Sequence, residues 1–162
     1  MSRILGLLVL CLACGGGAYA GGVYRDGEAV YRLSDPGDGW RRMDVRGEND
    51  LAWTHEGHAA IIQANASCNP GLDIPLTALT NHLLIGFTER ELAAQELVPM
   101  DGREALRTHM RAKLDGVPRE LLLVVLKKDG CVYDFALVAP LRGFTPARAS
   151  YDAMLQSFRT ES

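Results

Sequence analysis

The sequence predicts an α+β fold, in which an antiparallel β-sheet carries helices on both faces as a three-layer α/β/α sandwich. Three observations lead to this class. Asp-Gly dipeptides, which favour hairpin turns, recur at Asp26, Asp115 and Asp129. The segment 121–126, between two of these turns, is apolar on both faces of a strand, so it should lie mid-sheet with cover on each side. Other segments have apolar residues at helical spacing and can supply that cover.

The N-terminus is typical of an export signal. A single positive charge, Arg3, precedes an apolar run, Ile4–Ala13, which is too short to span a bilayer because spanning takes about 20 apolar residues. Residues 1–13 are therefore predicted to be a signal peptide. The next residue, Cys14, stands where a bacterial lipobox places the cysteine that receives lipid. The competing prediction is cleavage after Ala20, which would yield a soluble periplasmic or secreted protein.

Beyond the signal, the chain divides into a tether and one domain. The glycines that follow Cys14 predict that residues 14–22 form a flexible, lipid-anchored tether. Residues 23–160 then form a single domain, large enough to bury a core without metal ions. The net charge is −3 and no basic run occurs, which argues against a nucleic-acid surface.

The cysteines predict one disulfide. Export removes Cys11 with the signal peptide, and lipid occupies Cys14. Cys68 and Cys131 then remain as a pair in an oxidising compartment, where disulfides persist. They lie 63 positions apart, and chain-entropy arithmetic assigns a loop of that length about 4 kcal/mol of stabilisation. The alternative is two separate buried thiols.

The first half of the domain is predicted to form hairpins. A two-residue turn at Glu56-Gly57 would set Trp53 opposite Ala60 and leave Cys68 on the apolar face of its strand. The predicted strands are Val23–Arg25, Glu28–Leu33, Trp40–Val45, Leu51–His55 and His58–Cys68.

The second half is predicted to form a longer meander. Val117–Lys127 and Cys131–Ala139 flank an Asp-Gly turn, which sets Phe135 opposite Val124. Arg103–Leu114 fits either a helix or a strand, and the Asp-Gly turns on both sides favour a strand.

Three segments are predicted to be helical. Pro75–Phe87 has leucines at helical spacing and a proline in its first turn. Thr88-Glu89-Arg90-Glu91 has the pattern of a capping box, which predicts a short helix over residues 88–97. Thr145–Phe158 begins with Thr-Pro and places apolar residues on one face.

This order of elements resembles the Mog1/PsbP-like α/β-sandwich family, which includes envelope lipoproteins similar to DcrB. The resemblance covers roughly residues 28–160 and includes the terminal helix with its ending Met154-Leu155-Gln156-Ser157-Phe158. It implies an antiparallel sheet between helical layers that binds or supports other proteins, generally without catalysis. The family shares no catalytic set to carry over, and the pairing of Cys68 with Cys131 is not a general family feature.

The polar residues do not form a recognisable catalytic motif. His55 and His58 could share a metal ion across their turn, but no third ligand is evident, and an exposed hairpin tip is the favoured interpretation. His82 is expected on a helix surface. A basic stripe on one strand could contact anionic lipid head groups, although a solvated face is favoured. Its members are Arg107, His109, Arg111 and Lys113.

We therefore expect a non-enzymatic envelope lipoprotein without cofactors. It would be anchored through Cys14, face the periplasm of a bacterium, and serve as an accessory or scaffold module for a protein partner. One alternative is a small-ligand or lipid carrier, with a cavity between helix 75–87 and the small residues Ala60, Ala64 and Ala66. Another alternative is a metal-dependent or hydrolytic enzyme.

Overall fold

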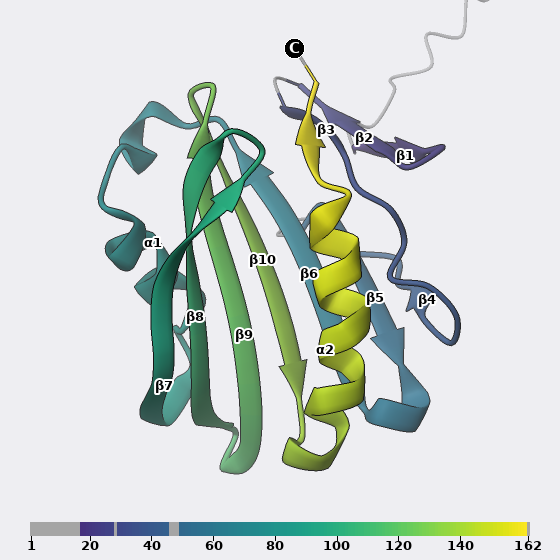
Figure 1. Cartoon of the computed structure of the whole chain (residues 1–162), viewed down its shortest axis with the longest axis vertical. Helices are drawn as coiled ribbons and strands as arrows, with labels where there is room; N and C mark the ends of the chain where they lie inside the picture. Colours follow the sequence, from purple (N-terminus) through teal and green to yellow (C-terminus); the bar gives the residue numbers. More distant parts are fainter. Residues whose placement is uncertain (1–16, 28, 46–48, 162) are drawn as a thin grey trace, which may run out of the picture.

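The computed structural model describes residues 17–27, 29–45 and 49–161, and in this part of the chain the strands form two antiparallel sheets (Figure 1). The smaller sheet has the order β1 (Ala18–Ala20), β2 (Val23–Asp26), β3 (Ala29–Arg32), β11 (Arg159–Thr160). The larger sheet has the order β4 (Arg41–Arg42), β5 (Leu51–His55), β6 (Ala60–Ser67), β10 (Cys131–Ala139), β9 (Val117–Lys128), β8 (Arg103–Leu114), β7 (Phe87–Met100). The helices are α1 (Leu76–Leu83) and α2 (Leu141–Gln156), and the short 3₁₀ helices are η1 (Glu56–His58) and η2 (Pro70–Leu72).

Strands β9 and β10 form the centre of the larger sheet in the predicted register. Phe135 lies opposite Val124, as the Asp129-Gly130 turn requires. All residues of the segment 121–126 are buried, because alternate side chains enter apolar layers on the two faces of the sheet. Arg103–Leu114 is strand β8, which confirms the favoured interpretation of that segment.

Helices α1 and α2 pack on opposite faces of the larger sheet. Helix α2 and the smaller sheet share a core with Leu122, Val124 and Leu126, whereas residues next to and within α1 pack with Leu121, Leu123 and Val125. Helix α1 has only 8 residues, and its strongest contacts are with β8 and β9. The α+β class is confirmed, but the complete three-layer sandwich is not.

The helix predicted over residues 88–97 is wrong, because these residues belong to strand β7. The backbone of Glu89, inside the expected first turn, is left-handed with φ 47°. β7 follows β8 along its length and pairs Met100 with Arg103 across the Asp101-Gly102 turn. This pairing outweighs a weak local preference for helix.

The hairpin of β5 and β6 is shifted by two residues from the predicted register. Trp53 lies opposite Ile62 rather than Ala60. The connection is η1 followed by Ala59 in the left-handed conformation (φ 49°), so it is longer than a two-residue turn. Because the shift is even, each side chain keeps its predicted face.

The other two predicted helices exist with different ends. The first is α1, which ends before the predicted Phe87, and the last is α2, which begins at Leu141 rather than Thr145. Gly143 allows α2 to approach η1 closely, since a Cβ there would collide with the carbonyl oxygen of His58. Of the strand predicted over residues 40–45, only Arg41–Arg42 is a strand.

Strand β1 lies within the segment predicted as a flexible tether. Ala18–Ala20 pair with β2, and the Tyr19 hydroxyl donates a hydrogen bond to the carbonyl of Leu33 at 2.8 Å. The Tyr19 ring also packs edge-on against Trp53, so this part of the segment is held on the domain. The predicted signal peptide and the lipidation of Cys14 fall on residues 1–16, which lie outside the described residues.

Candidate functional site

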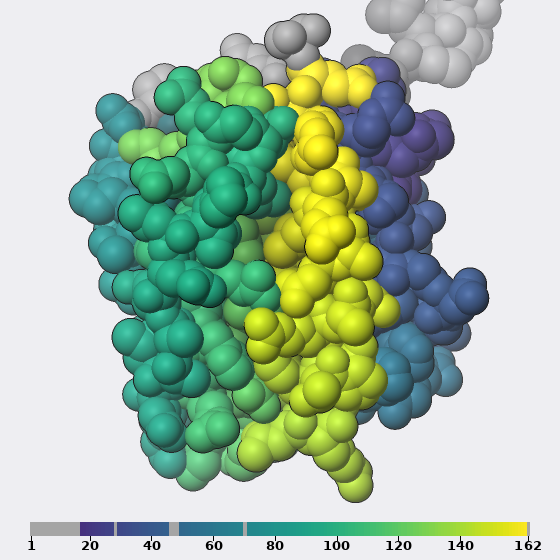
Figure 2. Space-filling view, viewed as in Figure 1, coloured from purple at the N-terminus to yellow at the C-terminus, as the bar shows by residue number. Residues whose placement is uncertain are grey.

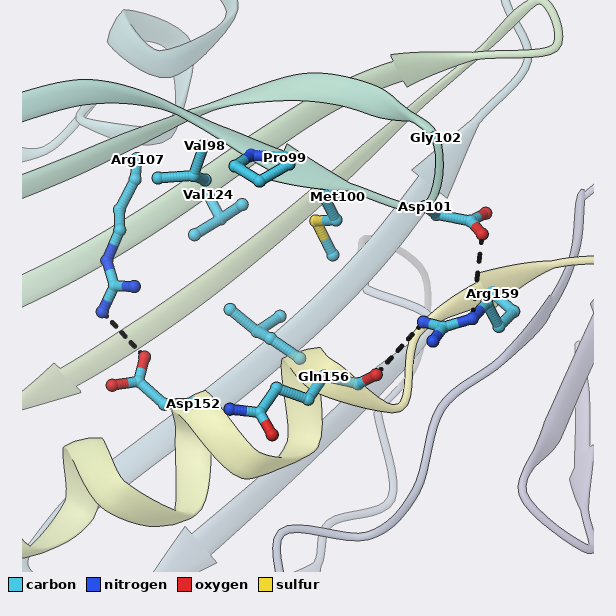
Figure 3. A pocket seen from close by; sticks show the side chains of 11 residues that line it. Val98, Pro99, Met100, Asp101, Gly102, Arg107, Val124, Asp152, Gln156 and Arg159 are labelled. Carbon is cyan, nitrogen blue, oxygen red and sulfur yellow. Dashed lines mark hydrogen bonds and ion pairs between the residues drawn. The ribbon is translucent and has the colours of Figure 1, made fainter.

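A groove of about 600 Å³ runs between α2 and the β7 side of the larger sheet. Helix α2 has its main sheet contacts with β10, β9 and β6, which leaves the face of β8 and β7 beside it open. Figure 2 shows the surface hollowed between these strands and the yellow helix. Figure 3 shows the lining side chains projecting from the sheet and from α2 toward the same space.

The groove has an apolar floor and charged ends. Val98 and Val124 project into it from β7 and β9. Leu155 of α2 also lines it. At one end Arg107 donates to Asp152 at 2.8 Å, and both side chains are at least two-thirds buried. The groove can therefore hold an apolar group between polar ends.

The other end of the groove is organised by Asp101, in the β7–β8 turn. Its carboxylate accepts hydrogen bonds from Lys128 at 2.7 Å and from the backbone and hydroxyl of Thr160 at 2.9 and 3.0 Å. Burial alone would raise the pKa of Asp101, but these hydrogen bonds outweigh it and hold the pKa below its usual value. Arg159 adds a weaker ion pair at 4.0 Å. Asp101 thereby fastens the chain's C-terminal strand to the end of the groove.

A second polar centre joins the smaller sheet to the larger one. Asp50 accepts hydrogen bonds from the hydroxyls of Tyr24 and Tyr31 at 3.0 and 3.2 Å, and from the backbone N–H of Ala66 at 2.9 Å. Burial raises the pKa of Asp50 despite these donors. Burial likewise raises the pKa of Asp134 on β10 to about 6. The contacts of Asp50 fasten β2 and β3 of the smaller sheet to β6 of the larger one.

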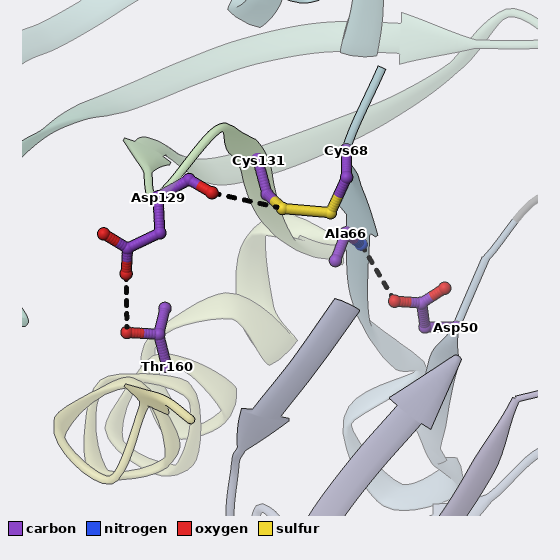
Figure 4. The surroundings of a disulfide bond; sticks show 6 residues. All are labelled: Asp50, Ala66, Cys68, Asp129, Cys131 and Thr160. Carbon is purple, nitrogen blue, oxygen red and sulfur yellow. Dashed lines mark hydrogen bonds between the residues drawn. A yellow bond between two sulfur atoms is a disulfide. The ribbon is translucent and has the colours of Figure 1, made fainter. Parts of the chain in front are cut away.

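The predicted disulfide is present, and Figure 4 shows it beside this centre. Cys68 and Cys131 join the ends of β6 and β10, with their Cα atoms 4.0 Å apart. Cys131 is buried. The bond thus ties two strands of the larger sheet at the end near Asp50 and Asp129 (Figure 4).

The histidines do not assemble a metal centre. The rings of His55 and His58 stack with centroids 3.8 Å apart, and the Nδ1 atom of His55 accepts the backbone N–H of His58. Across residues 17–27, 29–45 and 49–161, no group of three or more His, Cys, Asp or Glu side chains could hold a metal ion. His82 is exposed on α1, as expected.

The expected basic stripe on β8 is neutralised by acids. Arg107 pairs with Asp152, and His109 contacts Glu120 at 2.7 Å while its ring stacks on Phe144. The remaining two pairs are Arg111–Glu91 and Lys113–Glu89. The stripe is therefore a row of paired cations, and its Arg111 and Lys113 pairs remain in contact with solvent, as a solvated face requires.

The cavity predicted for a small-ligand carrier, between helix 75–87 and the small residues of β6, is not confirmed. Ala60 and Ala64 are fully buried in the core shared with α2, on the face opposite α1. Their small size lets α2 pack closely, and the groove lies elsewhere. The groove's ion pairs had no sequence signal, since Arg107 and Asp152 are 45 positions apart.

Solved structures resemble this fold across most of the chain. Cyanobacterial PsbP (CyanoP) from Synechocystis sp. PCC 6803 matches with a TM-score of 0.57 and 18% identity, over 93% of this chain and 96% of that one. LpqN of Mycobacterium tuberculosis, described as involved in cell envelope biogenesis, matches with a TM-score of 0.60 and 12% identity, over 84% and 87%.

The chain has a PsbP/Mog1-like fold. PA94 from Pseudomonas aeruginosa, described as a protein of unknown function and putative regulator, matches this chain with a TM-score of 0.51 and 15% identity, over 88% of this chain and 96% of that one. No known family model matches the sequence, and no curated protein sequence matches it. At these identities the likeness concerns the fold alone.

Proposed function

We propose that this chain is a non-enzymatic accessory protein of the bacterial cell envelope, anchored through lipid on Cys14, and that it binds a protein partner. The Cys68–Cys131 disulfide carries the proposal, because such bonds persist in oxidising compartments and are rare in the cytosol. The export-like N-terminus and the envelope role printed for LpqN support the same compartment. In the described residues no helix has the length and apolar character needed to cross a membrane.

The anchor is tested by the intact mass of the protein recovered from bacterial membranes. We expect loss of residues 1–13, acyl chains on Cys14, and no thiol that reacts before reduction. Cys14→Ser should release the protein from the membrane, whereas Cys11→Leu, which restores the usual lipobox residue, should leave it anchored. Retention of residues 1–13, or free thiols at Cys68 and Cys131, would contradict the proposal.

The groove beside α2 is the proposed partner-binding site. Its floor is apolar, and ion pairs fix both of its ends. Gln156 lines it and is exposed, so Gln156→Trp should fill it without disturbing the core. Ala153→Trp, on the exposed side of the same helix, is the matched control. Cross-links to envelope proteins should be lost in the first variant and kept in the second; equal cross-linking would refute this site.

A small-ligand carrier is the second candidate, and the size of the groove is what favours it. Ligand pockets commonly measure about 300–1,000 Å³ and are mostly apolar, and the groove of about 600 Å³ falls in this range. Native mass spectrometry of the protein should then show a retained metabolite or lipid that Gln156→Trp displaces. A ligand-free mass for the native protein would favour the protein-binding function.

A further inference from the structure

Strand β7 is an open edge of the larger sheet. It is the outermost strand beside β8 in the sheet order, and Figure 1 shows it at the margin. All ten residues from Thr88 to Leu97 are exposed. Register irregularities lie between Thr88 and Glu91 and between Leu92 and Ala94, so residues 94–100 form the regular part of the strand.

The turn geometry defines which backbone groups of β7 point outward. Asp101 and Gly102 both have positive φ, 48° and 77°, as in a two-residue hairpin turn. Met100 and Arg103, which flank the turn, then form a hydrogen-bonded pair, and such pairs alternate along the ladder. The N–H and C=O groups of Gln95 and Leu97 therefore point away from β8. No backbone partner meets them in the part of the chain that the structure describes.

The side chains along this edge favour a basic and apolar occupant. Leu97 is 56% exposed and Leu92 is 55% exposed, which leaves apolar surface beside the free backbone groups. Glu96 lies opposite Arg107 in the ladder, but Arg107 is engaged by Asp152. No cation within the described residues forms an ion pair with Glu96, so its carboxylate is available to a partner.

A second copy of this chain is a poor occupant of the same edge. In an antiparallel pairing of two β7 strands, one register sets Glu96 opposite Glu96, and like charges directly opposite each other are destabilising. A register centred on Leu97 sets Gln95 opposite Pro99, which lacks the N–H that the ladder needs. A register centred on Gln95 sets Leu97 opposite Ala93, at the irregularity.

We propose that residues 94–100 of β7 accept an extended, basic and apolar segment of a partner protein as an additional strand. The main-chain groups of Gln95 and Leu97 provide the hydrogen bonds, and Glu96 selects lysine or arginine on the groove face. This inference deepens the proposed function by naming the kind of partner segment. Its test measures strand addition and not export or lipidation, so its failure leaves the compartment proposal standing.

The test is titration of the full chain, recovered after its natural processing, with a short peptide that alternates lysine with valine. We expect saturable binding and slowed amide hydrogen exchange at Gln95 and Leu97. Leu97→Pro removes one outward N–H and should abolish binding. Glu96→Lys keeps the backbone intact and should weaken binding at least about threefold, because it reverses one exposed charge. Asp38→Lys makes the same charge change at an exposed loop and should leave binding unchanged.

Several outcomes would overturn the inference. The lysine peptide could fail to bind, or bind with protection only at residues of α2. A matched peptide that alternates glutamate with valine could bind equally well, or Asp38→Lys could weaken binding as much as Glu96→Lys. A stable dimer of the free protein with Gln95 and Leu97 already protected would show that a second copy occupies the edge.

Discussion

Strands β9 and β7 pair with the two sides of β8, but they lie in opposite environments. Residues 121–126 of β9 are all buried, between core layers on both faces of the sheet. Residues 88–97 of β7 are all exposed, and among the described residues no strand pairs with the outer side of β7. The difference teaches that stability is concentrated in the centre of the sheet, while the β7 side is left available for contacts.

The largest expected effect is a cavity at the centre. Phe135→Ala removes a fully buried ring that contacts Phe158, so the free energy of unfolding should fall by about 3–5 kcal/mol. Chemical denaturation of the variant and the parent measures this loss. A loss below about 1 kcal/mol would mean that the centre is not the stable part of the sheet.

Reduction of the disulfide should have the next largest effect. The bond closes a 63-residue separation, and its loss should lower the free energy of unfolding by about 2–4 kcal/mol. Denaturation with and without reductant measures the change. The double variant Cys68→Ala/Cys131→Ala should show the lowered stability in both conditions, and sensitivity of that variant to reductant would contradict the assignment.

A pH effect of intermediate size is expected at Asp134. Burial raises its pKa in the folded protein to about 6, so the folded state binds the proton more tightly than the unfolded state does. Stability should therefore decrease as pH rises from the ordinary aspartate pKa toward about 6, and then stay level. The raised pKa of Asp50 acts in the same direction.

Asp134→Asn should remove the part of this decline that Asp134 causes and raise the free energy of unfolding at neutral pH by up to about 3 kcal/mol. The amide oxygen can still accept the hydrogen bond from Asn65. Denaturation midpoints measured between mildly acidic and neutral pH give the slope. Asp38→Asn, at an exposed position, is the control, and an unchanged slope in Asp134→Asn would contradict this account.

The smallest effect is expected on the open strand. Leu97→Ala removes a side chain that is already 56% exposed, so the free energy of unfolding should change by less than about 0.5 kcal/mol. The same denaturation series as for Phe135→Ala gives the comparison. Similar decreases in the free energy of unfolding for the two variants would contradict the distinction between the centre of the sheet and β7.

The sequence predicted the central strands better than the edge, for a physical reason. The register of β9 and β10 follows from one Asp-Gly turn and from apolar residues on both faces. Residues 88–97 are rich in Glu, Ala and Leu and lack strand alternation, because solvent on most sides imposes no pattern on them. Their strand conformation depends on β8, which a local pattern does not reveal.

The candidate site was even less accessible to sequence reasoning. The disulfide could be predicted because the export hypothesis leaves one cysteine pair. The groove depends instead on where α2 crosses the sheet, and its ion pair joins Arg107 to a residue on another element. Such partners are brought together by packing, so no spacing in the sequence identifies them.

Amide hydrogen exchange across the larger sheet tests the central distinction most directly. We predict that the amides of Leu122 and Val124 exchange only through global unfolding, whereas those of Gln95 and Leu97 exchange almost as fast as in an unfolded chain. Glu96 and Val98, whose N–H groups point toward β8, should show intermediate protection. Equal protection at Gln95 and Val124 in the free protein would contradict an open edge and the partner site built on it.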